Sequence, residues 1–278
     1  MTASVVALAL FAAILHAAWN AFLRSGTDRF RTITLMGLSM VAVALPVAFV
    51  MPLPPAAAWP WLVGSSLLQV GYSCFLVVAY RHGDLGQIYP VVRGSVPVLV
   101  TLGGYLFLSQ RLELPQLAGV GLIACGIMGL AIGKSRASAA SLLCAVLAAL
   151  FIAAYATVDA RGVRVAGHAG SYAAWIFILY GSLMGLTFLA SRGRLAVDPF
   201  AADTWKAIGG GMVSLLAYGA IVAALALGPA GPVTALRETS VIFAALIGST
   251  FLGEALTRRR LLACVAVAAG AVCVGCVR

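Results

Sequence analysis

The stretch TALRETSVIF (residues 234–243) decides how the rest of the chain is interpreted. It places Arg237 beside Glu238 within a segment that is otherwise apolar or small. Charged side chains at membrane depth are costly, so two neighbouring charges need either a partner or a function. The segments that surround this pair, and the place elsewhere in the chain that matches it, predict the fold.

The composition predicts a polytopic membrane protein. The chain has 278 residues, of which 63% are hydrophobic and only 9% are charged. A soluble domain of this size does not need so much apolar surface. A membrane-spanning helix needs about 20 apolar residues. Ten such runs lie between the charge and proline clusters, with short connections: residues 3–23, 32–51, 59–80, 85–109, 113–133, 138–158, 171–191, 205–227, 230–252 and 259–277.

Three other interpretations of the composition are less favourable. The first run lacks a basic start and contains His16, so we interpret it as a mature helix and not as a signal peptide. The net charge of +10 comes from short loops that flank the runs, which argues against nucleic-acid binding. Cys273 and Cys276 form a CxxC without a nearby His or third Cys, so we expect no metal site and no cofactor.

The loop charges predict an orientation. The face of the membrane that holds the connections after the first, third, fifth, seventh and ninth runs carries twelve cations, against four on the other face. The positive-inside rule therefore places both termini outside the cytoplasm. The twelve cations are Arg24, Arg29, Arg31, Arg81, Lys134, Arg136, Arg192, Arg194, Lys206, Arg258, Arg259 and Arg260.

An internal repeat links TALRETSVIF to an earlier segment. A shift of 144 residues places Arg93 on Arg237, and FL at 107–108 on FL at 251–252. The predicted units are residues 1–135 and 136–278, each with five helices. An odd number of spans forces the two units into opposite orientations, as in many secondary transporters. We therefore predict an all-α membrane protein of ten transmembrane helices in two inverted five-helix repeats.

Three stretches resemble the EamA-like ten-helix transporters of the drug/metabolite transporter superfamily. They are HAAWNAFLRSG (16–26), a segment from AYRHGDLGQIYP to LSQRLE (79–113), and a segment from ALALGPAGPV through TALRETSVIF to LGEALTRRRLLA (224–263). The resemblance covers essentially the whole chain and is greatest for bacterial aromatic amino acid exporters. It implies a multi-pass transporter of the bacterial inner membrane, often an exporter of amino acids or other small metabolites.

The chain departs from that family pattern at two points. The first unit has LSQRLE where the second has LGEALT, so Gln110 stands where the family pattern has Glu. Members of the group are commonly drawn with both termini in the cytoplasm, which is the reverse of what the loop charges favour.

Polar and aromatic residues within the runs are the candidates for a transport pathway. In the first run, His16, Trp19 and Asn20 follow the spacing of one helix face, but a hydrogen-bonded packing cluster between the first and sixth predicted helices would give the same pattern. Asp159 is expected at the membrane interface. The candidate substrate-binding residues are His16, Trp19, Asn20, Tyr72, Tyr89, Arg93, Tyr155, Tyr218, Arg237 and Glu238.

The two arginines carry the most specific hypothesis. Pro90 and Pro97 are expected to break the helical ladder around Arg93, and broken backbone at membrane depth lies beside a cavity or within protein. Inverted topology would place Arg93 and Arg237 on opposite sides of the midplane, as two gates or substrate anchors. Glu238 has only Gly94 as its counterpart, so it could neutralise an arginine, bind an amine or couple a proton. A structural ion pair is the other interpretation.

These features favour a secondary transporter that moves small amphipathic metabolites, plausibly amino acids including aromatic ones, by alternating access. A multidrug or cation antiporter is the alternative, although the first run contains no Asp or Glu. An intramembrane enzyme would need a GxSxG, HExxH or paired carboxylates, and none is present at useful spacing. A structural or signalling membrane protein would not need the inverted repeat. The expected partners are a small-molecule substrate and the lipid bilayer, and we expect a monomer or weak homo-oligomer.

Overall fold

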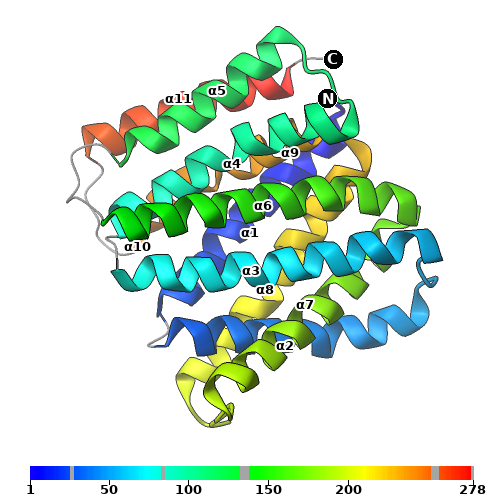
Figure 1. The fold of residues 1–278 in the computed structure, drawn as a ribbon. Helices are drawn as coiled ribbons and strands as arrows, with labels where there is room; N and C mark the ends of the chain where they lie inside the picture. Colours follow the sequence, from blue (N-terminus) through cyan, green and yellow to red (C-terminus); the bar gives the residue numbers. More distant parts are fainter. Residues whose placement is uncertain (26–27, 83–84, 132–137, 252–256, 277–278) are drawn as a thin grey trace.

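The structure is a computed structural model that describes residues 1–25, 28–82, 85–131, 138–251 and 257–276. Over these residues the regular structure is helical (Figure 1), which confirms the predicted all-α class. The elements in chain order are α1 Ala3–Ser25, α2 Arg29–Val50, the short 3-10 helix η1 Ala56–Ala58, α3 Trp59–His82, α4 Leu85–Leu108, α5 Leu114–Gly129, α6 Ala139–Ala166, α7 Ala169–Arg192, α8 Ala202–Leu227, α9 Ala230–Arg237, α10 Ser240–Phe251 and α11 Arg258–Gly275.

Eight segments of the described chain are long and apolar enough to cross a membrane. The helix α5 has 16 residues and falls short of a full span, and α11 begins with the three arginines 258–260. Large apolar side chains such as Phe49, Phe107 and Leu114 point outward, which suits contact with lipid. The protein is therefore a multi-pass membrane protein, and ten complete spans remain a prediction.

The predicted ninth run, residues 230–252, contains a break in its helix, whereas a break was expected in the run that holds Pro90 and Pro97. The ninth run forms two helices, α9 and α10, separated at Glu238 and Thr239. There the backbone bonds tighten from the i−4 to the i−3 spacing, as in Thr239 N to Leu236 O (3.1 Å) and Val241 N to Glu238 O (3.1 Å). By contrast α4 is one continuous helix with Pro90 and Pro97 inside it. The expectation of a break there is wrong, because neighbouring helices can accommodate the one hydrogen bond that each proline removes.

Helices of the first and second halves pack against each other throughout the bundle (Figure 1). The helix α1 packs on α8 and α3 packs on α6, while α2 packs on α7 and α5 on α11. The start of α1 and the end of α11 lie at the same end of the molecule (Figure 1). This interleaving brings side chains from both halves to the centre of the bundle.

Glycines allow the closest of these helix crossings. A Cβ added to Gly119 of α5 would lie 2.7 Å from the carbonyl oxygen of Gly270 in α11, and one on Gly270 would lie 2.6 Å from that of Gly119. Backbones in contact at this distance leave no room for any side chain. The α5–α11 pair therefore depends on both glycines.

Candidate functional site

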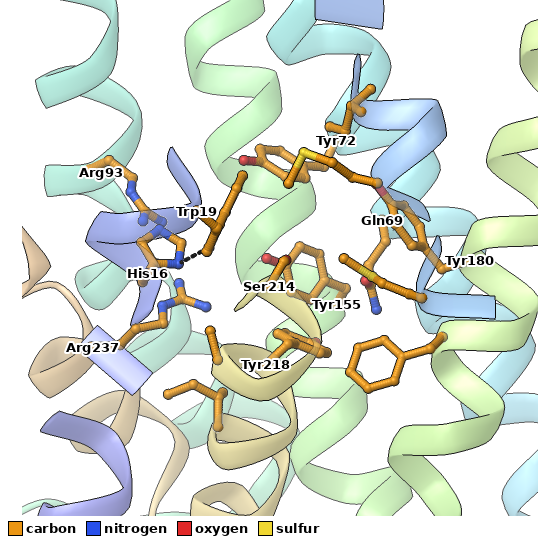
Figure 2. Close-up of a pocket in the computed structure, with 16 residues that line it drawn as sticks. His16, Trp19, Gln69, Tyr72, Arg93, Tyr155, Tyr180, Ser214, Tyr218 and Arg237 are labelled. Atoms are coloured by element: carbon orange, nitrogen blue, oxygen red, sulfur yellow. Dashed lines mark hydrogen bonds between the residues drawn. The ribbon is translucent and has the colours of Figure 1, made fainter. Parts of the chain in front are cut away.

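A pocket lies between helices of both halves, near the midpoints of α3 and α7 (Figure 2). Its cavity volume is about 80 Å³. Residues from α1, α2, α3, α4, α6, α7, α8 and α9 surround it. They are His16, Trp19, Ile33, Met36, Met40, Gln69, Tyr72, Arg93, Tyr155, Phe177, Tyr180, Ser214, Ala217, Tyr218, Ile221 and Arg237.

Seven of the ten candidate substrate-binding residues line this pocket: His16, Trp19, Tyr72, Arg93, Tyr155, Tyr218 and Arg237. The other three do not line it. The side-chain amide of Asn20 donates to the backbone oxygen of His16 (2.8 Å), so this contact lies within α1. The ring of Tyr89 lies under the Arg93 guanidinium at 5.8 Å, a cation–π distance.

Glu238 lies behind the pocket and joins the two arginines. Its Oε1 accepts from Nε (3.2 Å) and Nη2 (3.0 Å) of Arg237, and its Oε2 lies 3.3 Å from Nε of Arg93. All three side chains are buried, and Glu238 has no exposed surface. The expectation of two arginines separated at opposite mouths is therefore wrong, because both converge on one carboxylate in this conformation. That carboxylate belongs to the break between α9 and α10.

The ion cluster leaves a positive charge at the pocket. Two guanidinium groups share one carboxylate, so one positive charge has no counter-ion within the cluster. Nη2 of Arg93 is buried and has no hydrogen-bond partner within the described part of the chain. A buried donor without a partner is costly, which makes this atom a candidate contact for an anionic group.

His16 presents a second unpartnered donor. The indole of Trp19 can only donate, and it bonds Nδ1 of His16 at 3.0 Å, so Nδ1 must be an acceptor. The neutral ring then carries its proton on Nε2. That atom is buried, and among the described residues it has no partner. The hydrogen bonds of the first-helix cluster lie within α1, and two of its three members, His16 and Trp19, line the pocket.

Aromatic rings and methionines form the rest of the wall. The ring of Tyr155 lies 6.1 Å from those of both Tyr72 and Tyr218, tilted to the first and edge-to-face with the second. Phe177 of α7 lies 6.2 Å from Tyr218, and Met36 and Met40 contribute from α2. Sequence reasoning missed Met36, Met40 and Phe177, because a polar residue in an apolar run is visible as an exception and an apolar lining residue is not. It also missed Tyr180 of α7, whose hydroxyl lies 3.1 Å from that of Ser73.

Asp159 of α6 is a second buried carboxylate of the bundle. Its side chain has no exposed surface. Tyr172 of α7 donates to its Oδ1 at 2.9 Å, and Tyr218 of α8 donates to its Oδ2. The helices α7 and α8 cover this turn of α6 and satisfy the carboxylate with hydroxyl groups, so Asp159 is buried within the protein, and its expected position at the membrane interface stays a prediction.

The described residues contain no group of three or more His, Cys, Asp or Glu side chains positioned to hold a metal ion. The six cysteines are present as free thiols, with Cys276 exposed. The polar chemistry of the pocket is thus that of guanidinium, imidazole, amide and hydroxyl groups.

A bundle of apolar helices that encloses a central polar pocket beside a broken helix is typical of membrane transporters. The chain belongs to the EamA-like transporter family, whose model matches residues 3–132 and, a second time, residues 139–276. The protein is thus a multi-pass membrane transporter of small molecules.

Comparison with solved structures supports the fold. The chain is similar to a structure entitled "Crystal structure of protein", with a TM-score of 0.79 and 16% sequence identity over 99% of this chain and 97% of the other. At that identity the likeness concerns the fold alone. The comparison with curated proteins gives no match.

Proposed function

We propose that the protein is a secondary transporter that exports small amphipathic metabolites bearing a carboxylate, amino acids with aromatic side chains among them. The observation that carries the proposal is the single uncompensated positive charge left where Arg93 and Arg237 share Glu238. A solute carboxylate supplies the missing negative charge. It also offers acceptors to the unpartnered Nη2 of Arg93 and Nε2 of His16.

The rest of the pocket suits the remainder of such a solute. Figure 2 shows Arg93, Arg237 and His16 at one end of the pocket and Gln69 and Tyr180 at the other. Aromatic rings between these ends can enclose an apolar side chain. Hydroxyl and amide oxygens at the far end can accept from an ammonium group. Glu238 itself is engaged by both arginines, so it binds solute only through them.

Alternating access between two inverted five-helix repeats, residues 1–135 and 136–278, is the mechanism we propose. The helix pairing supports it: a five-helix offset exchanges the α1–α8 pair with the α6–α3 pair and leaves the α2–α7 pair unchanged. The two successive matches to the family model, residues 3–132 and 139–276, also support a division into two similar units. A cavity of about 80 Å³ is too small for most metabolites, so the helices must separate to admit one.

The positive pocket disfavours the alternative of a cation antiporter. A cationic drug would meet Arg93 and Arg237 without a free carboxylate on the pocket wall, which is a like-charge juxtaposition. We propose the bacterial inner membrane as the location. The twelve loop cations on one side of the predicted spans favour a cytoplasmic face there.

Uptake into liposomes that contain the purified protein tests the proposal. The solutes are phenylalanine, phenylpropionate, which lacks the amine, and phenylalaninamide, which lacks the carboxylate. We expect the two carboxylates to be transported and the amide to be excluded. Equal transport of the amide would refute the carboxylate subsite.

The variant Arg237→Gln tests the charge. It removes the surplus cation but leaves the Arg93–Glu238 pair to satisfy the carboxylate, so folding should survive. Loss of a charged hydrogen bond to solute corresponds to about 1.5–3 kcal/mol, or roughly 10- to 150-fold in affinity. The control Arg192→Gln removes an arginine that is 44% exposed and pairs with Asp28 at the surface. If both variants transport like the natural protein, Arg237 is structural only.

A further inference from the structure

A second buried carboxylate lies outside the ion cluster and takes no part in the proposed solute contacts. Asp159 is fully buried in α6 and accepts from Tyr172 and Tyr218. No ion pair joins it to a cation among the described residues. A buried carboxylate held only by neutral donors can exist either ionised or protonated, at a balance set by its surroundings.

The groups that face Asp159 are neutral on each of the elements that pack on α6. Tyr172 faces it from α7, Tyr218 from α8 and the hydroxyl of Ser65 from α3. Tyr155 lies one turn earlier on α6 itself, and the arginines of the elements beyond it, Arg93 of α4 and Arg237 of α9, both engage Glu238. The 3-10 helix η1 contains only alanines.

The remaining charged groups on these elements point elsewhere. On α6, Arg161 is exposed and Arg164 donates to the backbone oxygen of Gly228 at 2.7 Å. On α8, Asp203 and Lys206 pair with each other at 3.6 Å, near the opposite end of the helix. The side chains of Arg81 and His82 in α3 lie outside the described set.

Asp159 is linked to the pocket through shared side chains. Tyr218 donates its hydroxyl to Asp159 and also lines the pocket, where its ring contacts Tyr155 and Phe177. On the α3 side, the pocket residue Gln69 donates to Ser65 at 3.1 Å. A change at Asp159 can therefore reach the pocket wall directly through Tyr218, and through Ser65 and Gln69 on the α3 side.

Protonation changes what Asp159 can hold. The ionised carboxylate is an acceptor only, and it fastens Tyr172 and Tyr218 to α6. The protonated form has one O–H donor, so one of these two bonds must weaken or reverse. The helix α6 packs on α3, α7 packs on α2, and α8 packs on α1. Whichever bond is lost, α6–α7 or α6–α8, therefore joined two different pairs of packed helices.

We propose that Asp159 is the proton-binding site of this transporter, and that the gain and loss of one proton there, by way of Tyr218, is coupled to solute movement. The step is a simple ionisation: one proton joins the carboxylate and leaves it again in each cycle, with no other bond made or broken. The coupling rests on the proposed transport function, whereas the proton site rests on the geometry of Asp159.

Liposomes that contain the protein and a trapped pH-sensitive dye test the proposal. A phenylalanine gradient imposed without a pH gradient should drive a change in internal pH with the natural protein. The variant Asp159→Asn keeps the size of the side chain and an acceptor oxygen but cannot ionise. We expect it to lose the solute-driven pH change at least tenfold, while exchange of labelled for unlabelled phenylalanine stays within about twofold of the natural protein.

Asp203→Asn is the matched control, since it makes the same change at a surface carboxylate that is 36% exposed, and it should retain the pH change. If the natural protein exchanges phenylalanine but moves no protons, or if Asp159→Asn still moves them, the proton site is refuted. If Asp159→Asn loses exchange and pH change together, Asp159 has only a structural role. If the natural protein exchanges none of the three solutes, the proposed function fails instead. The proton site can then still be tested by measuring proton uptake by the detergent-solubilised protein between pH 4 and 9 and comparing it with that of Asp159→Asn.

Discussion

Replacing Glu238 with glutamine tests the ion cluster most directly. The substitution keeps the shape of the side chain but removes the one negative charge between Arg93 and Arg237. Two buried guanidinium groups then face a neutral amide, and the charge of the cluster rises from +1 to +2. We expect a large loss of stability, because an uncompensated buried charge is among the costliest changes a protein interior can undergo.

The magnitude follows from the distances. The carboxylate oxygens lie 3.0 to 3.3 Å from the guanidinium nitrogens, so the charge centres are about 4 Å apart. At an effective dielectric constant of about 20, each attraction is then about 4 kcal/mol. The variant loses two of them but recovers several kcal/mol that were spent on desolvating the carboxylate. The net loss should be about 3–5 kcal/mol, the range observed when one partner of a buried pair is removed.

The free energy of unfolding can be measured in mixed micelles by titration with sodium dodecyl sulfate, followed by tryptophan fluorescence. The control is again Asp203→Asn, which removes a surface carboxylate and should cost less than about 1 kcal/mol. Adding Arg237→Gln to Glu238→Gln should cost less than the sum of the single changes by about 2 kcal/mol, because the first change already breaks the pair. A Glu238→Gln loss no larger than that of the control would refute an ionised Glu238 between the arginines.

Two further predictions concern the contacts that hold the bundle together. Gln110→Ala removes the oxygen that accepts from the backbone N–H of Ala230 at 3.0 Å, at the start of α9, and should lower the same unfolding free energy by about 1 kcal/mol; no change would mean that water replaces this contact. Gly270→Ala places a Cβ 2.6 Å from the carbonyl oxygen of Gly119 and should cost about 1–3 kcal/mol, whereas Gly64→Ala, with open space around its Cβ, should be neutral or slightly stabilising. Equal effects of the two alanines would contradict the close α5–α11 crossing.

Gln110 also shows what a departure from a family pattern can mean. The sequence presents it as a glutamine where glutamate is expected. In the structure its carbonyl oxygen accepts from the N-terminus of α9, a contact that an amide oxygen makes as well as a carboxylate does. The residue thereby connects the end of the first half to the broken span of the second. Nothing in the spacing of LSQRLE indicates that partner, which lies 120 residues away.

The positions of helices could be predicted closely from the sequence, for a physical reason. A membrane span needs about 20 apolar residues, so the ends of each apolar run indicate where its helix begins and ends. Each of the ten predicted runs coincides with one helix, except the ninth, which forms α9 and α10. The break was misplaced because proline is a visible local signal, whereas the i−3 bonds lie around Glu238, whose partner Arg93 comes from α4 and is far away in the sequence.

Candidate residues could be found from the sequence because polar side chains in apolar runs are rare and costly. By that criterion alone, seven residues of the pocket wall were identified, including both arginines. The same criterion cannot detect Met36, Met40 or Phe177, which look like any other apolar residue of a span.

The sequence by itself therefore determined the class, the helical runs and the presence of two arginines at corresponding positions. Only the tertiary structure decided that these arginines meet on Glu238 and that Asp159 is buried between two tyrosines. The reason is that hydropathy is a property of each segment alone. Ion pairs and hydrogen bonds between α4 and the α9–α10 break, or between α6, α7 and α8, exist only after the two halves have packed together.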